Sequence, residues 1–210
     1  MGGDGGSVDA GARADGATHA RCDRAQRTLR VHILGPSGSG TTTLAREVAR
    51  IRGVPSFDTD DFYWLPSDPP FQAKRTIPER LCLLRDALEN APAWTLSGSL
   101  AGWGDPLVPL FDLVVFLELD PDIRMERLRR REVERYGPAR IGPGGDLEQG
   151  HAAFMEWAAR YEHGGLEMRS RRTHDEWLGR LPTACRLIRL DSSLPVQALV
   201  ARIAIHLVTD

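Results

Sequence analysis

The chain has 210 residues and a net charge of −2 at pH 7, which suits one α/β domain and disfavours nucleic acid as its main partner. It holds no apolar stretch of membrane-spanning length, and its N-terminus lacks the apolar core of a secretory signal. We therefore expect a soluble cytoplasmic protein, monomeric or homodimeric, without membrane contact. Its three cysteines show no C-x-x-C spacing, so we expect reduced thiols.

The N-terminal segment and the first elements differ sharply in composition. Residues 1–26 are rich in Gly, Ala and Asp and nearly free of large apolar side chains, so we expect a disordered tail. The following residues, 27–210, are expected to form the folded domain. Leu29–Leu34 predicts a short strand, and Leu44, Val48 and Ile51 recur at helical spacing.

Between that strand and helix, the sequence GPSGSGTTT over residues 35–43 matches the phosphate-binding pattern G-x-x-x-x-G-K-[ST] except at one position. Thr42 holds the hydroxyl position that ligates Mg²⁺, whereas Thr41 stands in place of lysine. Strand, glycine loop and helix together place backbone donors and the helix dipole at one point, which favours an anion site over a plain loop. The predicted nucleotide contacts are Gly35, Ser37, Gly38, Ser39, Gly40, Thr41, Thr42 and Thr43.

A cluster of carboxylates follows the predicted second strand, which ends near Asp58. Three negative charges at Asp58, Asp60 and Asp61 repel one another unless a cation or hydrogen-bond donors compensate them. Alternation along an extended segment places Asp58 and Asp60 on one face, as a functional pair. The alternative is a solvated acidic turn. The aromatic residues that follow, Tyr63 and Trp64, suit a pocket wall or core packing equally.

The next segment predicts a helix and a strand. Thr76 and Glu79 form a capping box, and the helix that they open is expected to face the core with Ile77, Leu81, Leu84 and Leu88. Residues 94–97 predict the third strand. Ser97, Gly98 and Trp103 follow at the carboxyl edge, where open α/β sheets bind ligands, and are therefore candidate substrate contacts, with turn formation as the alternative.

The C-terminal half contains two arginine clusters. Residues 112–119 predict a central parallel strand, and Asp120-Pro121 opens a helix that carries arginines from Arg124 to Arg135. Residues 136–150 are rich in Gly and Pro and are expected to be mobile. A helical segment at 151–162, a second arginine cluster at 169–172, a strand at 187–190 and a closing helix from 196 follow. Each cluster is either a solvated helix face or a set of phosphate ligands on a mobile segment. Strands that alternate with helices predict a parallel sheet.

With these features in order, residues 29–208 resemble the small P-loop kinases of the adenylate, shikimate and uridine kinase type. The chain is similar to bacterial proteins labelled adenylate kinase-like or AAA family ATPase, which share the GTTT loop, the DTDDFYWLP stretch and the SGSLAGWGD segment. The resemblance implies the P-loop NTPase fold, with a five-stranded parallel sheet of order 2-3-1-4-5, helices on both faces and an arginine-rich lid at about 129–180.

The resemblance also implies roles for individual residues. Asp58 matches a carboxylate that helps hold Mg²⁺ in shikimate kinase-like proteins, and Asp60 matches the one that orients and deprotonates the acceptor hydroxyl. Arg127, Arg130 and Arg131 fall where lid arginines neutralise the transferring phosphoryl group. We therefore take Arg127 and Arg131 as catalytic and Arg130 as nucleotide-binding.

These observations predict a kinase that uses ATP and Mg²⁺ to phosphorylate a small metabolite, with a nucleoside or nucleotide as the favoured acceptor. The alternative is a nucleotide sensor or weak ATPase that lacks efficient transfer because Thr41 replaces the lysine. Lys74 or a lid arginine is then a candidate to reach the γ phosphate in place of that lysine. An oligonucleotide-binding role receives little support from the overall charge.

Overall fold

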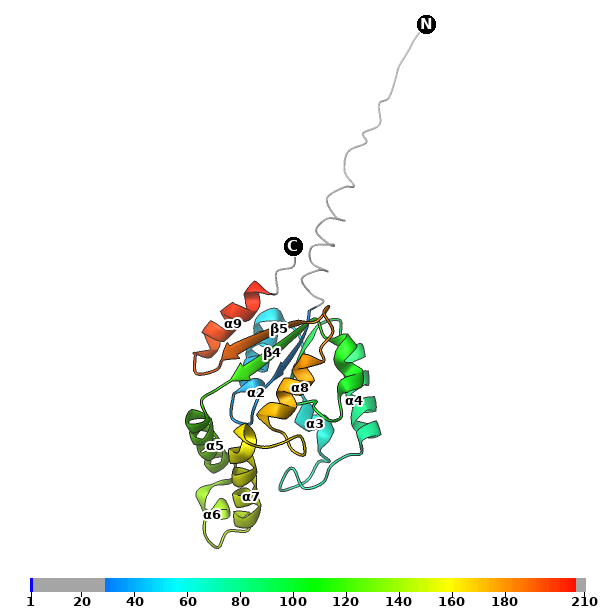
Figure 1. Ribbon diagram of the computed structural model, residues 1–210. Coiled ribbons are helices and arrows are strands. Elements are labelled where there is room, and N and C mark those ends of the chain that lie inside the picture. The colour runs from blue at the N-terminus through cyan, green and yellow to red at the C-terminus, as the bar shows by residue number, and fades with distance from the viewer. Residues whose placement is uncertain (2–28, 207–210) are drawn as a thin grey trace.

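The computed structural model describes Met1 and residues 29–206, so the predicted tail lies almost wholly outside the described residues. One sheet of five parallel strands lies in the order β2-β3-β1-β4-β5 (Figure 1). Its strands are β1 (Arg30–Leu34), β2 (Ser56–Asp58), β3 (Trp94–Ser97), β4 (Leu113–Glu118) and β5 (Arg186–Asp191). Both the predicted fold class and the predicted strand order are confirmed.

Helices cover both faces of the sheet because the central strands are apolar on both sides. The α-helices are α2 (Thr41–Arg52), α3 (Thr59–Tyr63), α4 (Ile77–Glu89), α5 (Pro121–Tyr136), α6 (Pro138–Ile141), α7 (Glu148–Ala159), α8 (Arg171–Gly179) and α9 (Val196–Ile205). In β4, Val114 and Phe116 pack with α4 and α8, whereas Leu113, Val115 and Leu117 pack with α2 and α9. Two 3₁₀ helices are η1 (Asp105–Leu110) and η2 (Arg160–Glu162).

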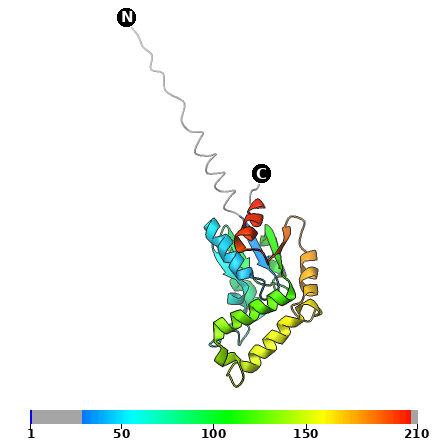
Figure 2. The same ribbon diagram turned by 90° about the vertical axis from the view of Figure 1, so that its left-hand side faces the viewer.

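The segment after β4 forms a helical arm. Figure 2 shows α5 and α7 running side by side and away from the sheet, with α6 near the far end. The segment 136–150, expected to be mobile for its Gly and Pro content, contains α6 and the start of α7. Pro138 begins α6, a position where its missing N–H costs nothing. Closure of this arm as a lid stays a prediction.

Two further sequence predictions concern α8 and α4. The second arginine cluster was expected either on a solvated helix face or on a mobile segment; Arg171 and Arg172 begin α8, which Ser170 caps by accepting a hydrogen bond from the Thr173 amide. In α4, the buried residues are Arg80, Leu84 and Leu88, whereas Ile77 is 46% exposed. The core-facing stripe of α4 therefore includes Arg80, which was not among the residues expected to face the core.

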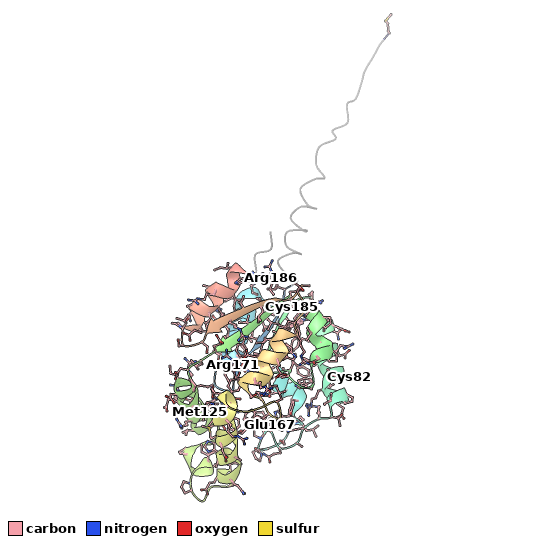
Figure 3. All side chains as sticks on the ribbon, viewed as in Figure 1. Cys82, Met125, Glu167, Arg171, Cys185 and Arg186 are labelled. Carbon is pink, nitrogen blue, oxygen red and sulfur yellow. The ribbon has the colours of Figure 1, made fainter. Side chains whose placement is uncertain are left out.

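The described cysteines are free. Cys82 lies on α4 and Cys185 just before β5, in different parts of the molecule (Figure 3), while Cys22 lies outside the described residues. Burial raises the pKa of the Cys185 thiol to about 11, so that thiol stays protonated at neutral pH. None of the helices in the described part of the chain is long and apolar enough to span a bilayer.

Two histidines are buried between the sheet and α8. His32 of β1 stacks on Phe111, and its Nδ1 lies 3.2 Å from the Leu96 carbonyl oxygen. The ring nitrogens of His174 lie 3.0 Å from the Ser99 hydroxyl and 2.8 Å from the Tyr161 hydroxyl. Burial lowers the pKa of each histidine to about 3, because desolvation penalises the imidazolium form.

These histidines predict that the fold loses stability in mild acid. Each takes up a proton near pH 6.5 when unfolded, whereas burial holds its folded pKa at about 3. The free energy of unfolding should therefore fall as the pH drops from about 6.5 to about 3, with a slope that approaches about 1.4 kcal/mol per pH unit for each histidine. Urea unfolding at several pH values measures this slope. His174→Gln should remove about half of it, and an unchanged slope in that variant would contradict the prediction.

Candidate active site

The phosphate loop joins β1 to α2 and leaves the start of that helix open. Gly40 has φ of +88° and provides no side-chain cap, so the first amides of α2 face the loop with the positive end of the helix dipole. A Cβ atom on Gly35 would lie 2.7 Å from the Ser39 hydroxyl oxygen and 2.8 Å from the Leu117 carbonyl oxygen. The buried Ser39 hydroxyl has no hydrogen-bond partner among the described residues. This tight, donor-rich loop suits an anion.

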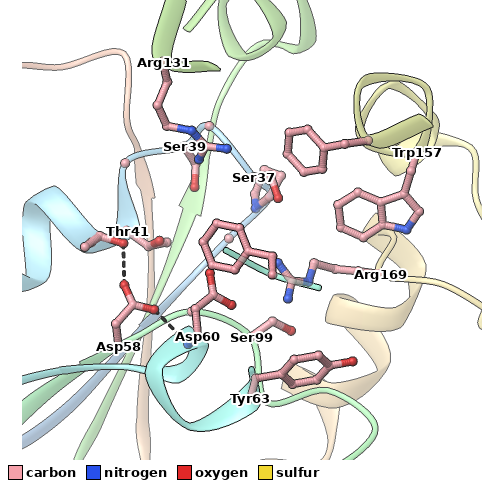
Figure 4. Close-up of a pocket in the computed structure, with 18 of the residues that line it drawn as sticks. Ser37, Ser39, Thr41, Asp58, Asp60, Tyr63, Ser99, Arg131, Trp157 and Arg169 are labelled. Carbon is pink, nitrogen blue, oxygen red and sulfur yellow. Dashed lines mark hydrogen bonds between the residues drawn. The ribbon is translucent and has the colours of Figure 1, made fainter. Parts of the chain in front are cut away.

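A large cavity opens beside the loop, at the carboxyl ends of the strands (Figure 4). Its volume is about 1820 Å³, more than the roughly 300–1,000 Å³ of a pocket for one small ligand, so it can hold two substrates. All predicted nucleotide contacts line it: Gly35, Ser37, Gly38, Ser39, Gly40, Thr41, Thr42, Thr43 and Arg130. The predicted acceptor and catalytic residues that line it are Asp58, Asp60, Tyr63, Trp64, Gly98, Trp103, Arg127 and Arg131.

The Asp58 carboxylate is the centre of a hydrogen-bond cluster. One of its oxygens accepts from the Thr42 hydroxyl at 2.8 Å and from the Ser97 hydroxyl at 2.9 Å. The other accepts from the Asp60 amide at 3.1 Å, which makes Asp58 the N-cap of α3. Ser97 is buried and does not line the cavity. Its place is thus behind Asp58, where it supports the carboxylate.

The sequence argument that separated Asp61 from the other two carboxylates is wrong. It assumed an extended segment, but residues 59–63 form α3, because Asp58 caps a helical turn. Helical geometry brings all three side chains, Asp58, Asp60 and Asp61, to the cavity. The pairing of Asp58 with Asp60 therefore depends on the cap and not on alternation.

Asp60 is open to the cavity, but protein atoms surround it on most sides. Its pKa is raised, first because burial desolvates the carboxylate and second because Asp58 is charged. Arg169, a hydrogen bond to Trp64 and Arg131 oppose this shift. Figure 4 shows Arg169 reaching toward Asp60 from the opposite wall. A carboxylate with a raised pKa is better suited to accept a proton than an ordinary aspartate.

Four of the arginines of α5 differ in their contacts and burial. Arg127 donates to the Ser192 carbonyl at 3.0 Å, and Arg131 donates to buried Glu132 at 2.8 Å. Arg130 is mostly exposed and lies 3.8 Å from Glu134. Arg124 is fully buried and does not line the cavity, and one of its terminal nitrogens donates to both carboxylate oxygens of Glu162.

Several cavity residues were missed by the sequence argument. In the second arginine cluster, only Arg169 lines the cavity, since Arg171 pairs with Glu118 and Arg172 with Glu176. Aromatic side chains of α7, including Trp157, form part of the wall, and no role was assigned to them from the sequence. Arg80 carried a detectable signal, because it occupies a core-facing position of α4.

The geometry is compatible with Mg²⁺ bound mainly through phosphates and water. Among the described residues, no group of three or more His, Cys, Asp or Glu side chains could hold a metal alone. Thr42 and Asp58 nevertheless provide two adjacent oxygen atoms beside the phosphate loop. Mg²⁺ commonly takes one or two protein oxygens and completes its shell with water and substrate phosphate.

Gly98, the first residue after β3, has little room for a side chain. Its φ is +103°, and a Cβ atom would overlap the Thr59 hydroxyl at the start of α3. Gly98→Ala should therefore lower the free energy of unfolding by more than about 2 kcal/mol, the upper cost of a left-handed residue alone. Gly102→Ala is the matched control, since Gly102 has φ of +82° but open space. Urea unfolding measures both, and equal losses would contradict the steric argument.

Comparisons with known proteins identify the family. A family model described as "AAA domain" matches residues 31–147. The chain belongs to this family. "Uncharacterized protein YqaC" of Bacillus subtilis (strain 168) is 42% identical over 177 residues, which cover 84% of this chain and 96% of that protein. The predicted membership of the P-loop small-molecule kinase-like superfamily is thereby confirmed.

More distant similarities agree with this assignment. Cytidylate kinase of Archaeoglobus fulgidus is 29% identical over 115 residues, which cover 50% of this chain and 62% of that enzyme. A structure of shikimate kinase from Acinetobacter baumannii in complex with shikimate aligns with a TM-score of 0.50 and 16% identity. It covers 86% of this chain and 94% of that one, and at this identity it shows the fold alone.

Proposed function

We propose that this protein transfers the γ-phosphoryl group of ATP to a hydroxyl group of a small metabolite, with nucleosides and nucleotides as the first acceptors to test. The observation that carries the proposal is the placement of Asp60 beside the Thr42–Asp58 pair, in the cavity that the phosphate loop opens into. A protein that only binds nucleotide has no need of a second carboxylate with a raised pKa at that place.

In the proposed reaction, the acceptor oxygen attacks the γ phosphorus of ATP and the bond from that phosphorus to the β–γ bridging oxygen breaks. Asp60 accepts the hydroxyl proton, ADP leaves, and the phosphorylated acceptor forms. The amides at the start of α2 bind the phosphate oxygens. Thr42 and Asp58 would hold Mg²⁺, which would neutralise charge on the β and γ phosphates.

The lysine-less loop needs another cation near the transferred group. Arg131 lines the cavity and points into it from α5 (Figure 4). Its Nε and one terminal nitrogen bond the same oxygen of Glu132, which leaves the other terminal nitrogen without a hydrogen bond to any described residue. Lys74, the other candidate, lies 5.7 Å from the Tyr63 ring and 5.6 Å from the Trp64 ring, on the wall formed by α3. This placement supports Arg131 for the phosphates.

The alternative function is a nucleotide sensor or weak ATPase, and Thr41 is the observation that favours it. To separate the two, the full chain is incubated with Mg·ATP and nucleosides, nucleoside monophosphates and small polyols, and ADP is followed. Release of ADP that depends on an acceptor supports the kinase. Tight ATP binding without turnover on any acceptor supports the sensor, and calorimetry without heat from ATP or GTP would overturn both. DNA affinity with a steep salt dependence would favour nucleic acid as the partner.

A further inference from the structure

Arg80 is a charged residue in a position that suits an apolar one. It belongs to the stripe of α4 that faces inward together with Leu84 and Leu88, and its relative exposure is 7%. Burial of a guanidinium group is costly unless other groups compensate its charge and its donors. The contacts of Arg80 therefore show whether the protein alone compensates this buried charge or leaves donors for a ligand.

The protein compensates Arg80 only in part. Its Nε donates to the Arg75 carbonyl at 2.8 Å, and its guanidinium carbon lies 3.6 Å from the centre of the Tyr63 ring and 5.8 Å from that of Trp103. Within residues 29–206, no carboxylate oxygen lies within 4 Å of this guanidinium, and its terminal nitrogens donate to no protein acceptor. Because Arg80 lines the cavity, these free donors are available to a ligand there.

Two more cations line the cavity: Lys74, beside the same aromatic residues as Arg80, and Arg169, on the opposite wall. The Lys74 ammonium lies over the rings of Tyr63 and Trp64, and the Arg169 guanidinium carbon lies 5.7 Å from the Trp157 ring centre. Neither makes an ion pair with a described carboxylate. In total, eight Lys or Arg side chains and five Asp or Glu side chains line the cavity, so its net charge is positive. Such a cavity attracts anions.

These contacts change the interpretation of the aromatic residues. Tyr63 and Trp64 were expected to stack on a base or sugar ring or to pack in the core. Instead, a guanidinium group covers the Tyr63 ring at 3.6 Å, and Lys74 lies near both rings. The aromatic groups thus hold cations in place by cation–π contact. A planar guanidinium held in this way presents its remaining N–H groups in a fixed orientation, which suits two oxygens of one anion.

We infer that the acceptor carries an anionic group, a phosphate or a carboxylate, that Arg80 and Lys74 bind while its hydroxyl faces Asp60. This inference rests on the proposed kinase function for the role of the ligand as acceptor. An anion site of this kind favours nucleotides over nucleosides. It also favours hydroxy acids and sugar phosphates over neutral polyols. Arg80 supplies the desolvated, oriented donors, and exposed Lys74 supplies further charge.

The test is a direct binding measurement on matched ligands. The full chain, saturated with Mg·ADP, is titrated by calorimetry with cytidine against CMP and adenosine against AMP for the phosphate arm, and with glycerol against glycerate for the carboxylate arm. We expect the anionic member of at least one pair to bind about 10- to 100-fold more tightly, the range for hydrogen bonds to a charged group. The arm that shows the preference identifies the anion.

Variants localise the effect to this wall. Arg80→Gln and Lys74→Gln should weaken the anionic ligand at least about 10-fold and leave its neutral partner unchanged. Arg85→Gln on the same helix is the control, because Arg85 is exposed and lies outside the cavity. Arg80→Lys retains a charge if Arg80→Gln fails to fold, and Lys74→Gln tests the wall without altering a buried position.

The outcomes separate this inference from the proposed function. Equal binding within every pair, no binding of any anionic ligand, or an anionic preference that survives both glutamine variants overturns the inference. ADP release with neutral acceptors alone overturns it as well and leaves the kinase intact. An anionic preference that depends on Arg80 upholds the anion site even when no acceptor is phosphorylated, and in that case only the kinase function fails.

Discussion

Asp60→Asn should lower kcat about 10²- to 10⁴-fold, the usual contribution of a positioned general base, while ATP affinity changes little. The carboxylate lies in the acceptor part of the cavity, and asparagine has nearly the same shape but cannot accept the hydroxyl proton. Burial raises the pKa of Asp60, so the base becomes protonated at a higher pH than an ordinary carboxyl group. The wild-type rate should therefore begin to fall at that higher pH as the solution is made more acidic. Steady-state assays across pH measure both effects, and the acidic limb should be absent from the variant.

Two comparisons distinguish a catalytic role of Asp60 from a structural one. Asp61→Asn is the matched control on the same short helix, and it should keep kcat within a few-fold of wild type. Asp60→Asn should also raise the free energy of unfolding at pH 7, since it removes a charge that burial and Asp58 both disfavour. A variant that loses stability together with activity, or that keeps its full kcat, would rule out Asp60 as the base.

The sequence predicted the parts of the site that depend on local backbone geometry. The glycine spacing between Gly35 and Gly40 determines how the loop turns, whatever the rest of the chain does. The apolar run of β4 predicts a strand that is covered on both faces, as the structure shows. The strand order came from resemblance, because no local pattern says which parallel strands are neighbours.

The parts that the sequence did not predict depend on polar side chains whose contacts the apolar pattern does not show. Asp58 forms a cap at the start of α3, and this turned a segment predicted as extended into a helix. Arg169 is separated from Asp60 by more than half of the chain, so their approach follows from the fold alone. Arg80 was missed because only apolar residues were assigned to the inward stripe of α4, although position 80 is one turn before buried Leu84. Each error concerns a polar group: the Asp58 cap and the Arg80 backbone bond are local, whereas the approach of Arg169 to Asp60 joins remote segments.

Arg131→Ala should lower kcat about 10²- to 10³-fold, the loss typical of one charged or polar group that stabilises a transition state. In most loops of this pattern, lysine reaches the β and γ phosphates, but here Thr41 cannot. The guanidinium of Arg131 enters the cavity from α5 and has an uncommitted terminal nitrogen. Arg129→Ala is the control on the same helix, since Arg129 is exposed and lies outside the cavity.

A second substitution distinguishes loss of a phosphate contact from loss of structure. Without Arg131, the buried Glu132 carboxylate loses its partner, so stability alone could explain lower activity. Thr41→Lys places an ammonium group at the loop without restoring the contact to Glu132. It should therefore recover at least about tenfold of the kcat that Arg131→Ala loses, while leaving the unfolding transition of that variant where it is. If Thr41→Lys has no effect on kcat in the Arg131→Ala background, or if Arg131→Ala alone retains wild-type kcat, then Arg131 does not take the place of the missing lysine.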